Sequence, residues 1–135
     1  MRNLITLLIL LCSLTVVAAA QSLPAGKWQL EECKFGPASE QPLKGIATTL
    51  VIKSEGKLGG NSGCNAYGGT YTVDKGKLAI TDIISTMRAC EEPTPTFEKD
   101  YFNTLENATS AEVKDDTLVI TDKNGRYLRF ARSKK

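Results

Sequence analysis

The chain has 135 residues, and its 17 Lys and Arg nearly balance its 15 Asp and Glu, for a formal net charge of +2. This length has room for one domain. The near-neutral balance gives no charge argument for nucleic acid or an anionic membrane as a partner. The chain contains no histidine, which excludes Ser–His and Cys–His catalytic pairs and zinc sites that use imidazole.

The N-terminus has the pattern of a secretory signal peptide. Arg2 supplies a positive charge, residues 4–17 are a mostly apolar run, and Ala18-Ala19-Ala20 supplies the small residues of a cleavage site. We therefore predict that residues 1–20 are removed and that residues 21–135 form a single domain, periplasmic or secreted.

Two other readings of this apolar run are less favoured. A membrane-spanning helix needs about 20 apolar residues, and the run is shorter, so no stable membrane insertion is expected. Lipoprotein anchoring through Cys12 requires a small residue just before the cysteine, and Leu11 stands there.

Strand patterns dominate the predicted domain. Trp28 and Leu30 alternate with polar residues, and an Asn-Gly step, the strongest short hairpin signal, separates the last two apolar runs. The predicted strands lie in residues 27–32, 46–53, 70–74, 78–83, 111–114, 117–121 and 127–130. The predicted turns are Lys75-Gly76, Asp115-Asp116 and Lys123-Asn124-Gly125, and residues 36–45 are a predicted loop.

One helix is predicted, over about residues 95–108. Thr94 is the candidate N-cap, with Pro95 at the first helical position, where its missing N–H costs nothing. The apolar face at helical spacing consists of Phe97, Tyr101, Leu105 and Ala108. This aromatic stripe favours core packing against the open side of a curved sheet over a ligand-binding role.

Residues 59–71 read GGNSGCNAYGGTY and hold five glycines between positions 59 and 69. Such a density suits a sharp corner, where two backbones approach closely or φ is positive. Asn61 and Asn65 also tolerate left-handed conformations. A phosphate-binding loop is not favoured, because no Gly-Lys-Ser/Thr follows.

The order of several motifs identifies a resemblance. Residues Gly63, Cys64, Asn65, Tyr67, Gly69 and Tyr71 are followed by Ser85-Thr86-Met87, Ala89-Cys90, Glu98, Tyr101 and Leu105. In this order and spacing, the sequence resembles the META domain, or HslJ-like, family over about residues 25–131. It departs from the pattern at Arg88, where a small or apolar residue is expected, and at Cys33, outside the motif.

The resemblance implies a fold but little chemistry. The implied fold is α+β and mainly β: an antiparallel, partly open barrel of about eight strands with one packed helix. The resemblance also implies a similarity to envelope or secreted proteins that are associated with stress, motility or virulence. The resemblance implies no catalytic residues and no cofactor.

Three cysteines remain after the predicted cleavage, so at most one internal pair can form. We favour Cys64–Cys90, which closes a loop of about 27 residues, and a pair involving Cys33 stays open. A metal site is not expected, because the close Cys-x-x-Cys spacing of zinc sites is absent.

We therefore expect an exported, non-enzymatic binding or interaction module of the cell envelope, monomeric, with a protein or apolar ligand as its unidentified partner. The alternative is a structural, stress-response envelope protein without a small-molecule ligand. A carboxylate-dependent hydrolase is less favoured, because Glu31-Glu32 and Glu91-Glu92 are expected on the solvated surface. Arg132 and Lys134-Lys135 are expected to be a solvated basic tail.

Overall fold

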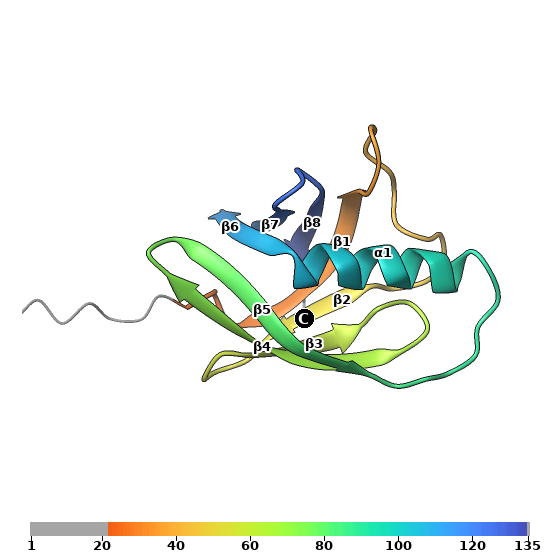
Figure 1. Cartoon of the computed structure of the whole chain (residues 1–135), viewed down its shortest axis with the longest axis horizontal. Helices are drawn as coiled ribbons and strands as arrows, with labels where there is room; N and C mark the ends of the chain where they lie inside the picture. Colours follow the sequence, from red (N-terminus) through yellow and green to blue (C-terminus); the bar gives the residue numbers. More distant parts are fainter. Residues whose placement is uncertain (1–21, 135) are drawn as a thin grey trace, which may run out of the picture.

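The computed structural model describes residues 22–134, and the predicted signal peptide lies outside them. Figure 1 shows a strongly curved sheet with one helix lying across its open side. The strands are β1 (Gly26–Lys34), β2 (Thr49–Ile52), β3 (Lys57–Asn61), β4 (Ala66–Asp74), β5 (Lys77–Ser85), β6 (Ala108–Lys114), β7 (Thr117–Asp122) and β8 (Tyr127–Arg132), and the helix is α1 (Thr94–Glu106).

The eight strands form one antiparallel sheet in the order β5-β4-β3-β2-β1-β8-β7-β6. Strand β1 lies in its middle, so the beginning of the domain pairs directly with its end. The sheet curls until its two end strands, β5 and β6, lie next to each other (Figure 1). The protein is thus a nearly closed barrel, mainly β with one helix, and the predicted fold class is confirmed.

Alternation along the strands separates the inside of the barrel from the outside. In β1, Trp28 and Leu30 are buried while Gln29 between them is exposed, as the period of two in a half-buried strand requires. A register shift between Leu30 and Glu32 marks a β-bulge. Beyond the bulge Cys33 faces inward and is fully buried.

Large side chains fill the interior. Tyr101 on α1 is fully buried, and its ring makes edge contacts with Tyr67 at 5.7 Å and Phe130 at 6.5 Å between centroids. The other largest fully buried apolar side chains are Trp28, Leu50, Leu105, Leu118, Ile120 and Leu128. The helix therefore closes the barrel with core residues, which is the packing role predicted for its aromatic stripe.

The glycine-rich segment 59–71 is mostly the two paired strands β3 and β4 and not only a corner, but the close backbone approach expected at its glycines is found. Gly60 has φ of +149°, and a Cβ built there would lie 2.1 Å from the carbonyl oxygen of Thr49 on the neighbouring strand. Only glycine fits this position without moving the backbone. Neither Asn61 nor Asn65 has a positive φ, so the left-handed conformation considered for them is not used. Their side chains act through hydrogen bonds instead.

Both predicted ends of the helix need correction. The N-cap is Pro93, which makes no side-chain cap hydrogen bond, and Thr94 is the first helical residue. Thr94 is buried, with its methyl group packed near Gly63, so its side chain serves the core. At the other end, Ala108 belongs to β6, because Asn107 ends the helix and its carbonyl accepts the backbone N–H of Lys123.

Candidate functional site

Several residues of the family motif meet around the side chain of Asn65. Asn65 is buried, and its Oδ1 accepts hydrogen bonds from the hydroxyl of Thr86 and the backbone N–H of Arg88, both at 2.8 Å. Its Nδ2 donates to Glu98 Oε1 at 2.7 Å. One amide side chain thus joins the glycine-rich corner, the segment after β5 and the helix, and we call these contacts the Asn65 junction.

Glu98 completes the Asn65 junction from the first turns of the helix. Its Oε2 accepts the backbone N–H of Asn65 at 3.1 Å and lies within hydrogen-bonding distance of the Ser62 hydroxyl. Hydrogen bonds to a carboxylate are stronger than those between neutral groups. Ser62 is fully buried, whereas Glu98 is half-buried. No sequence pattern predicted the contact between Ser62 and Glu98.

A disulfide lies beside the Asn65 junction. It joins Cys64 to Cys90, with the two Cα atoms 6.2 Å apart, and leaves Cys33 as a buried free thiol. This is the pairing favoured from the sequence. Together with the bonds of Asn65, it holds both ends of the segment Thr86–Cys90 against the barrel.

The segment held in this way exposes apolar side chains. The side chain of Met87 is 97% exposed, and Ile84, at the end of β5, is 75% exposed. Isolated apolar residues on a surface are common. Here, however, Ile84 lies near the end of β5 and Met87 lies just beyond it, next to a disulfide and a buried polar junction that fix the backbone. We call Ile84 and Met87 the exposed pair.

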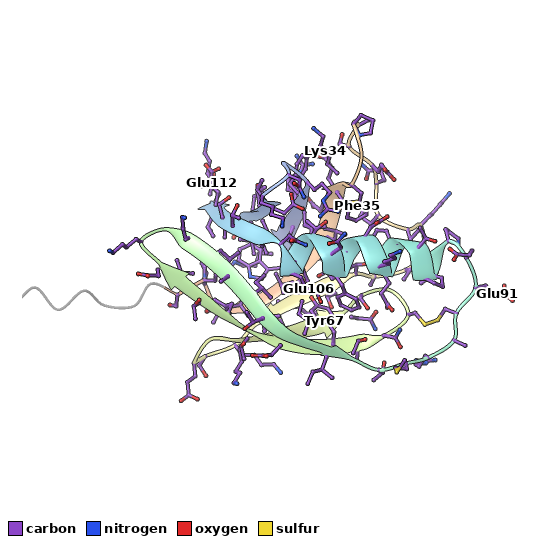
Figure 2. The ribbon with its side chains drawn as sticks, viewed as in Figure 1. Lys34, Phe35, Tyr67, Glu91, Glu106 and Glu112 are labelled. Carbon is purple, nitrogen blue, oxygen red and sulfur yellow. A yellow bond between two sulfur atoms is a disulfide. The ribbon has the colours of Figure 1, made fainter. Side chains whose placement is uncertain are left out.

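Tyr67 and Tyr71, the two tyrosines of the motif that lie on β4, are buried inside the barrel, away from the exposed pair. The hydroxyls of Tyr67 and Tyr101 are 2.7 Å apart, and the Tyr67 hydroxyl donates to the carbonyl of Thr49. The Tyr71 hydroxyl accepts the backbone N–H of Leu23. Figure 2 shows Tyr67 beneath the helix. Tyr67 and Tyr71 therefore serve the core. A Cβ built at Gly69 would lie 3.1 Å from the carbonyl oxygen of Thr81, so the glycine at this position allows close strand packing.

Burial keeps three acidic groups of the interior neutral. Desolvation, together with the nearby carboxylates of Glu40 and Glu32, raises the pKa of Cys33 to about 12. Burial also raises the pKa of both Tyr67 and Tyr101 well above the ordinary value for tyrosine. In the unfolded chain these groups ionise near pH 9 to 10.

These shifts predict a loss of stability at alkaline pH. Above pH 9 the unfolded chain binds fewer protons than the folded one, so the free energy of unfolding falls as the pH rises. Below about pH 8 these groups do not reduce the free energy of unfolding. Between pH 8 and pH 10 that free energy drops by about 2 kcal/mol, most of it because of Cys33. Urea titrations at both pH values test this. Cys33→Ala should flatten the profile, and an unchanged slope in that variant would contradict the assignment.

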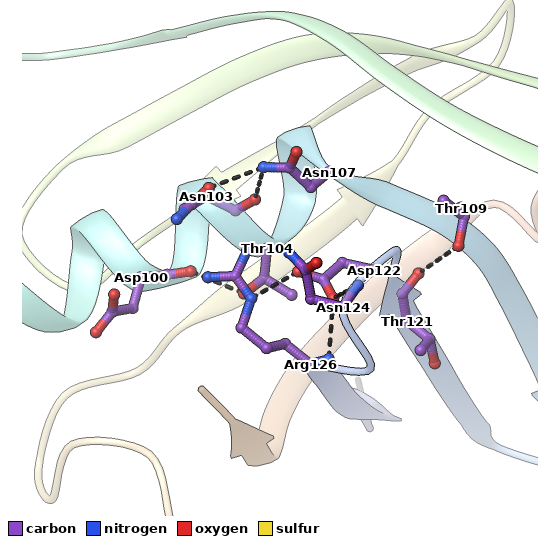
Figure 3. A network of polar contacts seen from close by, with 9 residues as sticks. All are labelled: Asp100, Asn103, Thr104, Asn107, Thr109, Thr121, Asp122, Asn124 and Arg126. Atoms are coloured by element: carbon purple, nitrogen blue, oxygen red, sulfur yellow. Dashed lines mark hydrogen bonds and ion pairs between the residues drawn. The ribbon is translucent and has the colours of Figure 1, made fainter. Parts of the chain in front are cut away.

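A second polar network ties the other end of the helix to the barrel (Figure 3). Asp122, whose side chain is fully buried, accepts the backbone N–H groups of Asn124 and Arg126 and pairs with the Arg126 guanidinium at 2.6 Å. It fixes the β7–β8 turn, whose Lys123 caps the carbonyl of Asn107. The network shapes a hairpin that the sequence predicted, but the role of Asp122 was not foreseen.

The two adjacent carboxylate pairs considered for hydrolysis have different surroundings in the structure. Glu31 is exposed at the β-bulge, while Glu32 accepts hydrogen bonds from Tyr127 and Arg129. Contrary to expectation, Glu32 is therefore engaged with neighbouring strands, because the bulge turns it toward β8. Glu91 and Glu92 are exposed, as predicted.

Two further findings concern residues 22–134. No helix in this part of the chain is long and apolar enough to span a membrane. Among the same residues, no group of three or more His, Cys, Asp and Glu could hold a metal ion.

The basic tail predicted at the C-terminus is only partly a tail. Arg132 is the last residue of β8, and its guanidinium lies over the ring of Trp28, 4.3 Å from the ring centroid. Lys134 is exposed, as expected. The prediction of a solvated end is therefore wrong for Arg132, because pairing of β8 with β1 brings it onto Trp28.

These features define a class: a small, mainly β barrel domain with one covering helix and a disulfide between the glycine-rich corner and the segment that leads to the helix. The META domain family matches residues 21–135. The chain belongs to this family, as the resemblance indicated.

Solved structures share the fold. A protein from Burkholderia xenovorans, determined by NMR, is 26% identical with a TM-score of 0.68, over 82% of this chain and 83% of that chain. A DUF4847 family protein from Bacteroides vulgatus ATCC 8482, a crystal structure, is 16% identical with a TM-score of 0.58, over 82% and 94% of the two chains. The comparison with curated proteins gave no match.

Proposed function

We propose that this META domain is an exported, non-enzymatic interaction module of the cell envelope, and that it contacts a protein partner through the exposed pair. The observation that carries this proposal is how the residues of the family motif are bonded and exposed in the structure. Its buried polar atoms hydrogen-bond to one another beside the disulfide, and two large apolar side chains, those of Ile84 and Met87, stay exposed next to them. Apolar side chains on a fixed backbone suit the centre of a protein interface.

The filled interior supports contact on the outside. A barrel that binds a small apolar ligand inside it needs an open cavity. In this barrel, Trp28, Tyr101 and Phe130 fill the interior. The same observation favours the second candidate, a role in envelope assembly or maintenance without a small-molecule ligand. Both candidates place the domain outside the inner membrane, where an exposed disulfide such as that at Cys90 persists.

Export is tested by the intact mass of the protein from its own host. We expect a chain that begins at Gln21, with two of its three cysteines oxidised. Full-length protein with all four cysteines reduced in the cytoplasmic fraction would overturn the proposed location.

The interaction surface is tested by site-specific photocrosslinking in the same host. A photoreactive residue at Met87 should give one discrete protein adduct, which Ile84→Ser should reduce at least fivefold. A matched probe at Ala79, exposed at the other end of β5, should give none. Equal adducts from both positions, or none at Met87, would refute the proposed surface.

A further inference from the structure

A hollow of about 920 Å³ lies where β1 begins and β8 ends. In the sheet, the strands β4, β3 and β2 separate β1 from β5, the strand that carries Ile84 of the exposed pair. Its volume is within the range of small-molecule sites. Its charged lining residues are Lys27, Arg132 and Lys134, and no Asp or Glu lines it. Gln29, Thr49 and Ser133 add neutral polar groups.

Arg132 is held in place before any ligand arrives. Its guanidinium is stacked over Trp28, and its Nη1 donates to the carbonyl of Ala25 at 3.2 Å. Gly26 makes room for it, because a Cβ built at Gly26 would lie 2.8 Å from Nη1. A guanidinium that is already oriented loses less entropy when it binds an anion than a mobile one.

The positive charge of the hollow is only weakly compensated. Arg132 Nε lies 3.4 Å from Asp116, but that carboxylate is 85% exposed, and exposed ion pairs contribute little. Within residues 22–134, neither Lys27 nor Lys134 forms an ion pair. The backbone N–H of Ser133 donates to the carbonyl of Lys27 at 2.8 Å, which keeps the segment with Lys134 beside β1.

A hollow lined by Lys123 and Arg126 also has no Asp or Glu in its lining, but Arg126 is paired there with the buried Asp122 at 2.6 Å. Two other hollows that contain cations include a carboxylate in the lining itself. The one beside the 41–47 segment holds Glu31 together with Arg129. The one on the outside of β3 and β4 holds Asp82 together with Lys53 and Lys57. In both, the protein supplies its own carboxylate.

We propose that the hollow formed by Lys27, Arg132 and Lys134 binds a small anionic group, a carboxylate or a phosphate, with the Arg132 guanidinium as its oriented donor. This site is separate from the surface in the proposed function and does not depend on it. The anionic group can be a free ion or the headgroup of a phospholipid.

Trp28 reports directly on this site, because it is the single tryptophan of the chain and stacks on Arg132. We expect inorganic phosphate and acetate, titrated at constant ionic strength into residues 21–135, to give a saturable change in tryptophan fluorescence. Vesicles of phosphatidylglycerol, with phosphatidylcholine vesicles for comparison, test the headgroup as the source. Saturation by the free ions or selective binding to the anionic vesicles would each support the site and would identify its source.

Matched variants separate a built site from net charge. Lys27→Gln with Lys134→Gln should weaken binding about tenfold without affecting the fold, since both side chains are exposed. Lys77→Gln with Lys99→Gln removes the same charge from exposed positions elsewhere and should leave binding within twofold. Arg132→Gln should abolish the fluorescence response. Equal losses in the two double variants, or no saturable response to any of the probes, would overturn the proposal.

Discussion

Removing the Cys64–Cys90 disulfide is expected to lower the free energy of unfolding by about 3.5 kcal/mol. The bond closes a loop across a sequence separation of 26, and a cross-link of this span restricts the unfolded chain by about that amount. Cys90 is exposed, so a mild reductant can reach the bond in the folded protein. Cys64→Ala with Cys90→Ala removes it permanently. Urea unfolding gives the difference, with the m-value fitted separately for each protein because the unfolded chain without the cross-link exposes more surface.

Reductant provides the control for this prediction. Dithiothreitol should lower the stability of the parent protein to that of the double alanine variant and should leave the variant itself unchanged. If the reduced and oxidised parent proteins unfold at the same urea concentration, the disulfide does not contribute in the way proposed here. If reductant also destabilises the double variant, its remaining cysteine, Cys33, forms a disulfide between two chains.

Local sequence patterns were sufficient for most of the fold. Alternation predicts which side chains of β1 face inward, since Trp28 and Leu30 must leave water while Gln29 need not. Turn residues predict where strands reverse, and Lys75, Asp115 and Gly125 all have the positive φ that tight turns use. Such signals depend on residues close together in the chain, which is why they can be read without the structure.

The contacts of the candidate sites depend on tertiary approach and could not be read in the same way. Glu98 precedes Tyr101 by three residues, and its pattern fits an exposed position at the positive end of a helix. Only the packing of the helix against the corner brings it to Ser62 and Asn65. Similarly, the sequence around Arg132 fits a basic tail, and only the pairing of β8 with β1 places Arg132 beside Trp28.

Replacing Asn65 is expected to be about as costly as losing the disulfide. Asn65→Ala removes two hydrogen bonds accepted by Oδ1 and one donated to the carboxylate of Glu98. With about 1 kcal/mol for each neutral bond and about 2 for the charge-assisted one, the expected loss of unfolding free energy is 3 to 4 kcal/mol. Asn124→Ala is the matched control, because the Asn124 side chain is exposed, and it should cost less than about 0.5 kcal/mol.

A second substitution at the same position tests the role of Glu98. Asn65→Asp preserves the shape and both acceptor contacts, but it places a second carboxylate against Glu98 in place of an N–H donor. Like charges at this distance oppose each other, so the variant should be unstable at pH 7 and regain stability toward pH 4, where protonation supplies the missing donor. A loss that does not change with pH would show that Glu98 does not bond to Asn65. A cost of less than 1 kcal/mol for Asn65→Ala would show that the Asn65 junction does not hold the Thr86–Cys90 segment in place.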